Sequence, residues 1–148
     1  MAIASRRAQT TWEGTLAGGH GSVDGDSGAI DSLPVTWEAR TQAPNGKTSP
    51  EELAAAAHSS CFAMALALRL GEHKARAERM SVAATVTLDE VDGLPTIVSS
   101  ELEIVAEVGA VDEDAFQAIV QEAAELCPVS RLFAGADISV RAELQPPS

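Results

Sequence analysis

The sequence predicts an α+β fold in which helices pack against one face of a largely antiparallel sheet. Segments of alternating apolar and polar residues, typical of half-buried strands, occur near the N-terminus, in the middle of the chain and at its end. A long apolar helical segment begins at Pro50, and a shorter amphipathic one precedes Pro128. The length of 148 residues suits one compact domain, so we expect a single domain over residues 1–148, with a flexible or extended N-terminus over residues 1–9.

The first third of the chain is predicted to form strands. Residues 12–16 alternate between apolar or small and polar types, and a Gly-Gly turn follows them. A second alternation begins after Pro34 and continues to Ala39. Arg40 is therefore expected at the end of a strand, on the side away from the apolar residues.

A helix is predicted to begin at Pro50. Ser49 suits the N-cap, Pro50 the first helical position, and Glu52 the third position of a capping box. The stretch Leu53–Leu68 is apolar on almost every side but shorter than the roughly 18–20 apolar residues of a membrane span. We therefore expect a buried central helix that is covered from several directions.

The second half of the chain is predicted to alternate between strands and one helix. Two antiparallel strands, 82–88 and 102–108, are joined around an Asp-Gly turn. Asp112 then caps an amphipathic helix that ends at Cys127, where a proline follows. Residues 138–144 form a last alternating strand.

The charge balance excludes two classes of partner. Lys and Arg number 10 against 22 Asp and Glu, which gives a formal net charge of −12. Such a chain repels phosphate backbones and anionic lipid head groups, so we expect neither a nucleic acid nor a membrane as a partner. Polar residues follow Arg6 and Arg7 where a signal peptide needs an apolar run, and we expect a cytoplasmic protein.

The two cysteines require an explanation, because the cytosol keeps structural thiols reduced. Cys61 lies in the middle of the most apolar helix, where a buried cysteine can also act simply as a small apolar residue. Cys127 directly precedes Pro128, at the start of a second short helix whose N-terminus would favour a thiolate. For each cysteine, a redox or nucleophilic role competes with that of an inert thiol.

His58 lies three residues before Cys61, on the same face of the predicted helix. This spacing suits a Cys-His nucleophile pair or one half of a metal site, but a lone buried histidine is more often a core residue. His20 and His73 provide no second metal-binding pair, so we expect no metal. Glu51 is not needed for the capping box, and its position leaves it free for another role.

The segment Ser49-Pro-Glu-Glu-Leu-Ala-Ala-Ala-Ala-His-Ser-Ser-Cys-Phe-Ala-Met-Ala-Leu, followed downstream by Cys127-Pro-Val-Ser, resembles the OsmC/Ohr family, on its OsmC branch. The order of elements agrees from Thr10 to Leu144. The resemblance implies an OsmC/Ohr-like fold, with antiparallel sheets around a long central helix, and an intertwined homodimer with active sites at the subunit interface. It also implies a thiol peroxidase that reduces organic hydroperoxides, and hydrogen peroxide more weakly, in oxidative and osmotic stress defence.

The resemblance also implies a role for four residues. Cys61 matches the peroxidatic cysteine and Cys127 the resolving one. Arg40 is similar in place to the arginine that holds the thiolate and polarises the peroxide, and Glu51 matches the glutamate that positions this arginine. Helix-terminus electrostatics alone would favour Cys127 as the more acidic thiol, but an adjacent arginine can lower the pKa of a buried cysteine as effectively.

The expected reaction needs no cofactor, because the cysteines carry the electrons. A sulfenic acid on Cys61 condenses with Cys127 to a disulfide, which an external dithiol, such as the lipoyl groups that the resemblance implies, then reduces. Glu51 lies ten residues before Cys61, about 15 Å along a straight helix, so a common site requires the partner chain or a long bridge. An apolar substrate pocket is expected from Leu53, Phe62, Met64 and Phe133.

Two other functions remain as alternatives. A dimeric binding module for a small apolar ligand, without catalysis, would have inert buried thiols. A hydrolase or transferase would use Cys61 and His58, and replacing His58 by Ala would abolish that activity but leave a peroxidase mostly intact.

Overall fold

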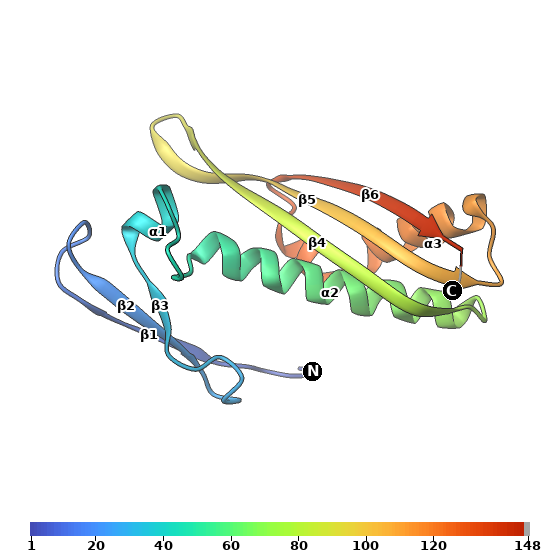
Figure 1. The fold of residues 1–148 in the computed structure, drawn as a ribbon, viewed down its shortest axis with the longest axis horizontal. Helices are drawn as coiled ribbons and strands as arrows, with labels where there is room; N and C mark the ends of the chain where they lie inside the picture. Colours follow the sequence, from blue (N-terminus) through green and yellow to red (C-terminus); the bar gives the residue numbers. More distant parts are fainter. Residues whose placement is uncertain (147–148) are drawn as a thin grey trace. The chain divides into compact units, whose positions relative to one another are not determined.

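The computed structural model describes residues 1–146, and its contacts divide the chain into two compact units, Met1–Leu53 and Ala54–Ser148. Three-stranded sheets and helices alternate along the chain, which confirms the predicted α+β class (Figure 1). In chain order the elements are β1 (Ala8–Glu13), β2 (His20–Gly25), β3 (Leu33–Val35), α1 (Trp37–Thr41), α2 (Pro50–Glu72), β4 (Arg76–Val91), β5 (Leu94–Gly109), α3 (Glu113–Leu126), α4 (Pro128–Leu132) and β6 (Asp137–Gln145).

The first unit contains an antiparallel sheet in the order β1-β2-β3. Ala8 and Gln9 already belong to β1. The turn between β1 and β2 requires glycine at Gly19, where an added Cβ would lie 2.3 Å from the carbonyl oxygen of Thr15. The antiparallel pairing of β1 with β2 confirms the predicted hairpin, although β1 ends at Glu13, before Leu16.

The prediction of a strand that reaches Ala39, with Arg40 at its end, is wrong. β3 ends at Val35, and Arg40 lies in the short helix α1. The Thr36 hydroxyl accepts a hydrogen bond from the backbone N–H of Ala39 at 3.1 Å, which is N-cap geometry. Because this cap satisfies a backbone donor and residues 38–40 are good helix formers, the chain turns into a helix here.

The start of α2 agrees with the prediction. The Ser49 hydroxyl accepts a hydrogen bond from the backbone N–H of Glu52 at 3.2 Å, and Pro50 is the first helical residue. The other half of the capping box differs, since the Glu52 carboxylate accepts a hydrogen bond from the Thr48 hydroxyl. Two neighbouring hydroxyls therefore fix the first turn of α2.

The second unit contains a mixed sheet in the order β4-β5-β6. β4 and β5 are antiparallel and joined at Asp92 and Gly93, whose φ angles of +52° and +78° suit the predicted hairpin turn. β6 pairs with β5 in parallel. β4 begins at Arg76, earlier than the alternation predicts, because charged residues at its start interrupt the apolar pattern.

α2 and α3 lie along one face of this sheet (Figure 1). Asp112 caps α3 as predicted, and its carboxylate accepts a hydrogen bond from Ala115 N–H at 2.8 Å. The buried core consists of Phe62, Ala65, Leu66, Leu70, Ala75, Leu102, Ile104, Ala106, Val108, Phe116, Ile119, Val120, Ala123 and Cys127. Side chains from α2, β5 and α3 therefore share one core.

The opposite face of α2 is exposed and consists of small or apolar residues. We call the row formed by Ala56, Ala57, Ser60, Met64, Ala67 and Leu68 the α2 stripe. Among the described residues of the second unit, the core buries one face of α2 and leaves the α2 stripe exposed. A helix of this length and composition can cross a membrane or form the centre of a soluble protein, and its packing against the sheet favours the second.

Candidate functional site

The two cysteines meet in the second unit. Cys61, on α2, is half-buried, and Cys127, at the junction of α3 and α4, is fully buried. Both are free thiols, and the Cys127 thiol lies within hydrogen-bond reach of Cys61. Pro128 cannot continue α3, so the chain turns at Cys127 and begins α4 there. The predicted pair of thiols is thus close together, although Cys127 lies far from Cys61 in sequence.

The surroundings of Cys61 act on its thiol in opposite directions. Burial raises the pKa of the Cys61 thiol, a hydrogen bond from the backbone of Val129 lowers this pKa, and the neighbouring Cys127 raises it. Val129 is the second residue of α4, so its N–H is one of the donors that have no partner inside the helix. The sequence predicts that this helix start serves Cys127. The structure directs the amide to Cys61 instead, and Cys127 forms no side-chain cap hydrogen bond.

His58 is fully buried in the same unit. Its Nδ1 lies 2.6 Å from Ser100 Oγ on β5, and its Nε2 lies 2.8 Å from Ser130 Oγ on α4. Its ring also meets the ring of Phe133 edge to face, with centroids 5.3 Å apart. Burial lowers the pKa of His58, so the ring stays neutral near pH 7. Since both nitrogens contact serines, the described residues do not form a hydrogen-bonded pair of His58 and Cys61.

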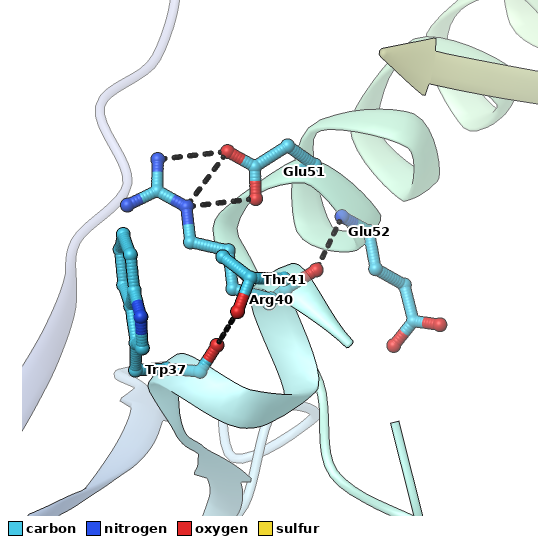
Figure 2. Close-up of polar contacts among 6 residues, drawn as sticks. Trp37, Arg40, Thr41, Glu51 and Glu52 are labelled. Atoms are coloured by element: carbon cyan, nitrogen blue, oxygen red, sulfur yellow. Dashed lines mark hydrogen bonds and ion pairs between the residues drawn. The ribbon is translucent and has the colours of Figure 1, made fainter. Parts of the chain in front are cut away.

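The first unit brings Arg40 of α1 to Glu51, in the first turn of α2 (Figure 2). Arg40 Nε donates to both carboxylate oxygens of Glu51 at 3.0 and 3.1 Å, and Nη2 donates to Oε1 at 2.8 Å. The Glu51 side chain is 10% exposed, which shields this charge-assisted contact from water. The guanidinium also lies over the Trp37 ring, 5.9 Å from the ring centroid. These contacts hold the guanidinium in one orientation, with Nη1 outside the pair with Glu51.

An apolar pocket of about 320 Å³ opens beside Arg40 in the first unit. Among its described lining residues, Arg40 alone carries a charge. The lining consists of Thr10, Trp12, Leu16, Val23, Val35, Thr36, Trp37, Arg40, Pro50 and Leu53. The pocket thus combines apolar walls with one cationic group.

Of the four residues expected to contact substrate, Leu53 lines this pocket. Phe62 is fully buried in the core of the second unit, and Met64 is 74% exposed on the α2 stripe. Phe133 packs against the ring of His58. These three therefore do not contribute to the pocket of the first unit.

Sequence reasoning missed Ser100, Ser130 and Trp37. Ser100 lies two residues before Leu102, and the period of two in a strand places both on the core face, which is a usable signal. Trp37 lies three residues before Arg40, a spacing that has meaning only once α1 is known to be a helix. Ser130 ends the motif Cys127-Pro-Val-Ser, but the motif alone does not indicate that its hydroxyl contacts His58.

No group of three or more His, Cys, Asp or Glu side chains within residues 1–146 is arranged to hold a metal ion.

Solved structures share this fold. The crystal structure of the organic hydroperoxide resistance protein OhrB of Bacillus subtilis has a TM-score of 0.70 over 94% of this chain and 98% of that chain, with 28% sequence identity. The structure of an organic hydroperoxide resistance protein OsmC from Legionella pneumophila has a TM-score of 0.73 over 98% and 99%, with 22% identity. The predicted OsmC/Ohr-like fold is confirmed.

Sequence comparison gives the family. The family model described as OsmC-like protein matches residues 43–143. Peroxiredoxin OsmC of Escherichia coli (strain K12) is 37% identical over 128 residues, which cover 86% of this chain and 89% of that protein. OhrB of Bacillus subtilis is 28% identical over 140 residues, or 88% and 94% of the two chains. The chain belongs to the family of OsmC-like proteins, as the motifs indicate.

Proposed function

We propose that this chain is a thiol-dependent peroxidase that reduces organic hydroperoxides, and hydrogen peroxide more weakly, in oxidative and osmotic stress defence. The observation that supports this most directly is the contact between the half-buried thiol of Cys61 and the buried thiol of Cys127. The names of relatives, peroxiredoxin OsmC and organic hydroperoxide resistance protein, indicate the same class of reaction.

The reaction uses both thiols in turn. The Cys61 thiolate attacks the distal oxygen of the hydroperoxide, the O–O bond breaks, and the alkoxide takes up a proton and leaves as an alcohol. The sulfenic acid on Cys61 then condenses with the Cys127 thiol, which forms a disulfide and releases water. The short path between the two sulfur atoms makes Cys127 the natural resolving thiol.

Arg40 supplies the positive charge that this chemistry needs. A guanidinium beside a thiolate lowers the pKa of the thiol, and its N–H groups polarise the O–O bond as negative charge develops on the leaving oxygen. Glu51 holds this guanidinium bidentately, while Nη1 is outside that contact and can donate to a peroxide oxygen. The apolar pocket beside Arg40 accommodates the alkyl group, which favours organic hydroperoxides.

A homodimer completes the site. The α2 stripe is an apolar helix face that a second copy of α2 can cover, and its small residues permit close approach of two helices. The Arg40–Glu51 pair of one chain then serves Cys61 of its partner, which resolves the spacing of Glu51 and Cys61 along one helix.

The remaining requirements are few. The electrons pass from the thiols to the peroxide, so the reaction proceeds without a cofactor, and an external dithiol such as a lipoyl group restores the thiols. A cytoplasmic location suits such a cycle, because that compartment supplies reduced dithiols.

Stopped-flow mixing of the pre-reduced protein with an alkyl hydroperoxide tests this proposal. Wild type should consume the peroxide rapidly and form one alcohol per peroxide, whereas Cys61→Ser should not react. Absence of reaction in the wild type would contradict the peroxidase.

The apolar pocket also fits the alternative of a dimeric binding module for a small apolar ligand without catalysis. In that case an apolar probe should bind to wild type and Cys61→Ser equally, and the wild type should consume no hydroperoxide. The same stopped-flow experiment therefore separates the two functions.

A further inference from the structure

Three buried side chains form a continuous hydrogen-bonded link between three elements of the second unit. Ser100 of β5, His58 of α2 and Ser130 of α4 are 0%, 0% and 8% exposed. The two hydrogen bonds at His58 are 2.6 and 2.8 Å long, so the link runs without a gap from the central strand of the sheet to α4. We call Ser100, His58 and Ser130 the buried bridge.

A neutral imidazole meets the chemical needs of this bridge. It carries one donor and one acceptor nitrogen, and each serine hydroxyl can donate or accept, so both ring nitrogens have a suitable partner whichever tautomer is present. Both ring nitrogens are occupied, and the side chain has no contact with solvent. His58 therefore does not have a free nitrogen for proton transfer, and any effect on the cysteines must act through its neighbours.

α4 depends on such contacts for its position. It spans five residues, Pro128–Leu132, too few for a helix that is stable by its own hydrogen bonds. His58 contacts it twice, at Ser130 through Nε2 and at its C-cap residue Phe133 through the ring face and edge. His58 thus fixes both the depth and the rotation of α4 against α2.

The position of α4 determines what Cys61 meets. Val129, whose backbone hydrogen-bonds to Cys61, directly precedes Ser130 in the chain. Cys127, the N-cap residue of α4, contacts Cys61 from the same turn. His58 and Cys61 are three residues apart on one face of α2, so α4 is held to this face at two neighbouring points.

We propose that His58 is a positioning residue that acts through Ser130 to hold α4, so that the Val129 amide and the Cys127 thiol both face Cys61 and the Cys61–Cys127 disulfide closes rapidly. Its importance for catalysis rests on the proposed peroxidase, while the positioning itself does not. This changes the expectation from sequence that a peroxidase would remain mostly intact without His58: the first attack would continue, but resolution would slow.

Variants that separate the two ends of the bridge test this proposal. Gln at position 58 can extend its amide to the place of Nε2 and keep the contact with Ser130, whereas Asn reaches only the place of Nδ1 and keeps the contact with Ser100. Ser130→Ala removes the contact with α4 directly. In His58→Asn and Ser130→Ala, we expect the rate of disulfide formation to be lower than in wild type by about tenfold or more. His58→Gln should retain most of the wild-type rate.

Closure is measured with diamide on the reduced protein, without any hydroperoxide. Diamide accepts the two electrons and two protons that the thiols lose as the S–S bond forms. The pH dependence of iodoacetamide reaction at Cys61, read by peptide mass, is the second readout. Its midpoint should shift in Ser130→Ala, because α4 carries both the Val129 amide, which lowers the pKa of Cys61, and Cys127, which raises it.

Ile104→Val is the matched control, since Ile104 is 1% exposed in the same core and its truncation removes one buried methyl group without touching the bridge. The Cys61–Cys127 disulfide of this variant should form at the wild-type rate. The proposal would be overturned if Ser130→Ala formed the disulfide at the wild-type rate with an unchanged alkylation midpoint. It would also be overturned if Ile104→Val slowed disulfide formation as much as Ser130→Ala does. If wild type does not consume hydroperoxide but Ser130→Ala still slows closure by diamide, the peroxidase fails and the positioning role stands.

Discussion

Cys61 lies among groups that act against each other. Burial and the neighbouring Cys127 raise the pKa of its thiol, and the Val129 backbone hydrogen bond lowers it. A peroxidatic thiol reacts as the thiolate, so a further positive charge near Cys61 would bring the thiol into the range where it reacts near pH 7. The proposed partner of this thiolate is Arg40.

Replacing Arg40 by Met should therefore shift the pH dependence of peroxide consumption to higher pH. Loss of a cation beside a thiolate raises the pKa of the thiol by about one unit or more, so the rate at pH 7 should fall about tenfold or more. The measurement is the stopped-flow rate from pH 5 to pH 9. Arg7→Met is the control, because Arg7 forms an exposed ion pair with Asp26 in the same unit. An unchanged profile in Arg40→Met would show that Arg40 does not act on the thiolate.

Replacing Cys127 by Ser should stop the cycle after the first step. Cys61 can still attack the hydroperoxide, but the sulfenic acid has no resolving thiol, so one peroxide per chain is consumed. Dimedone, which labels sulfenic acids, should then modify Cys61, as seen by peptide mass. Continued turnover of this variant with a dithiol would argue that the reductant attacks the sulfenic acid directly and that Cys127 is dispensable.

At the level of elements, the sequence predicts best where side chains cap or break helices. Three helix boundaries are found where expected. Ser49 and Pro50 mark the start of α2, Asp112 marks the start of α3, and Pro128 marks the point where α3 has ended. The path around Arg40 was mispredicted because three apolar residues at alternate positions fit a strand and a short capped helix equally. A tertiary contact, the ion pair with Glu51, distinguishes these two structures, and such contacts are absent from local patterns.

The buried bridge makes the packing of three elements sensitive to pH. Burial lowers the pKa of His58 below 6.5, so the unfolded chain binds a proton at mildly acidic pH that the folded chain does not bind. His58 should therefore not reduce the free energy of unfolding above pH 6.5. Below pH 6.5 the free energy of unfolding should fall by about 1.4 kcal/mol per pH unit, until the pKa of His58 in the folded state is reached. Urea unfolding of the reduced protein at several pH values, compared with His58→Gln, isolates this contribution. Equal pH dependence in the two proteins would show that His58 is protonated in the folded state as easily as in the unfolded one.

At the level of the whole molecule, the all-round apolar character of α2 predicts that it is covered on several sides, yet the described core of the second unit buries one face. The α2 stripe remains exposed, with Met64 at 74% and Leu68 at 52%. Sequence periodicity cannot distinguish a helix face that is buried within the chain from one that is buried by a second chain, since both require the same residues. Met64, which was expected among the apolar residues around the substrate, lies on this stripe.

Introducing a charge on the stripe should dissociate the proposed dimer. Met64→Glu places a carboxylate on an exposed face of the single chain, where it costs little, but inside a helix–helix interface it would be unpaired and desolvated. We expect a monomer in sedimentation velocity and a loss of peroxidase activity. Leu94→Glu is the control, because Leu94 is 66% exposed at the β4–β5 turn, away from the stripe. A dimer that persists in Met64→Glu would place the interface elsewhere.

Oxidation with a single equivalent of hydroperoxide tests whether Cys61 and Cys127 act as one redox pair. One equivalent of alkyl hydroperoxide is added to the reduced protein, free thiols are then alkylated, and the digested peptides are analysed by mass. We expect one alcohol per chain, no alkylated cysteine, one linked peptide that contains Cys61 and Cys127, and the mass of a single chain for the undigested protein under denaturing, non-reducing conditions. Two thiols that both remain available for alkylation, or a disulfide formed only between chains, would contradict this pairing.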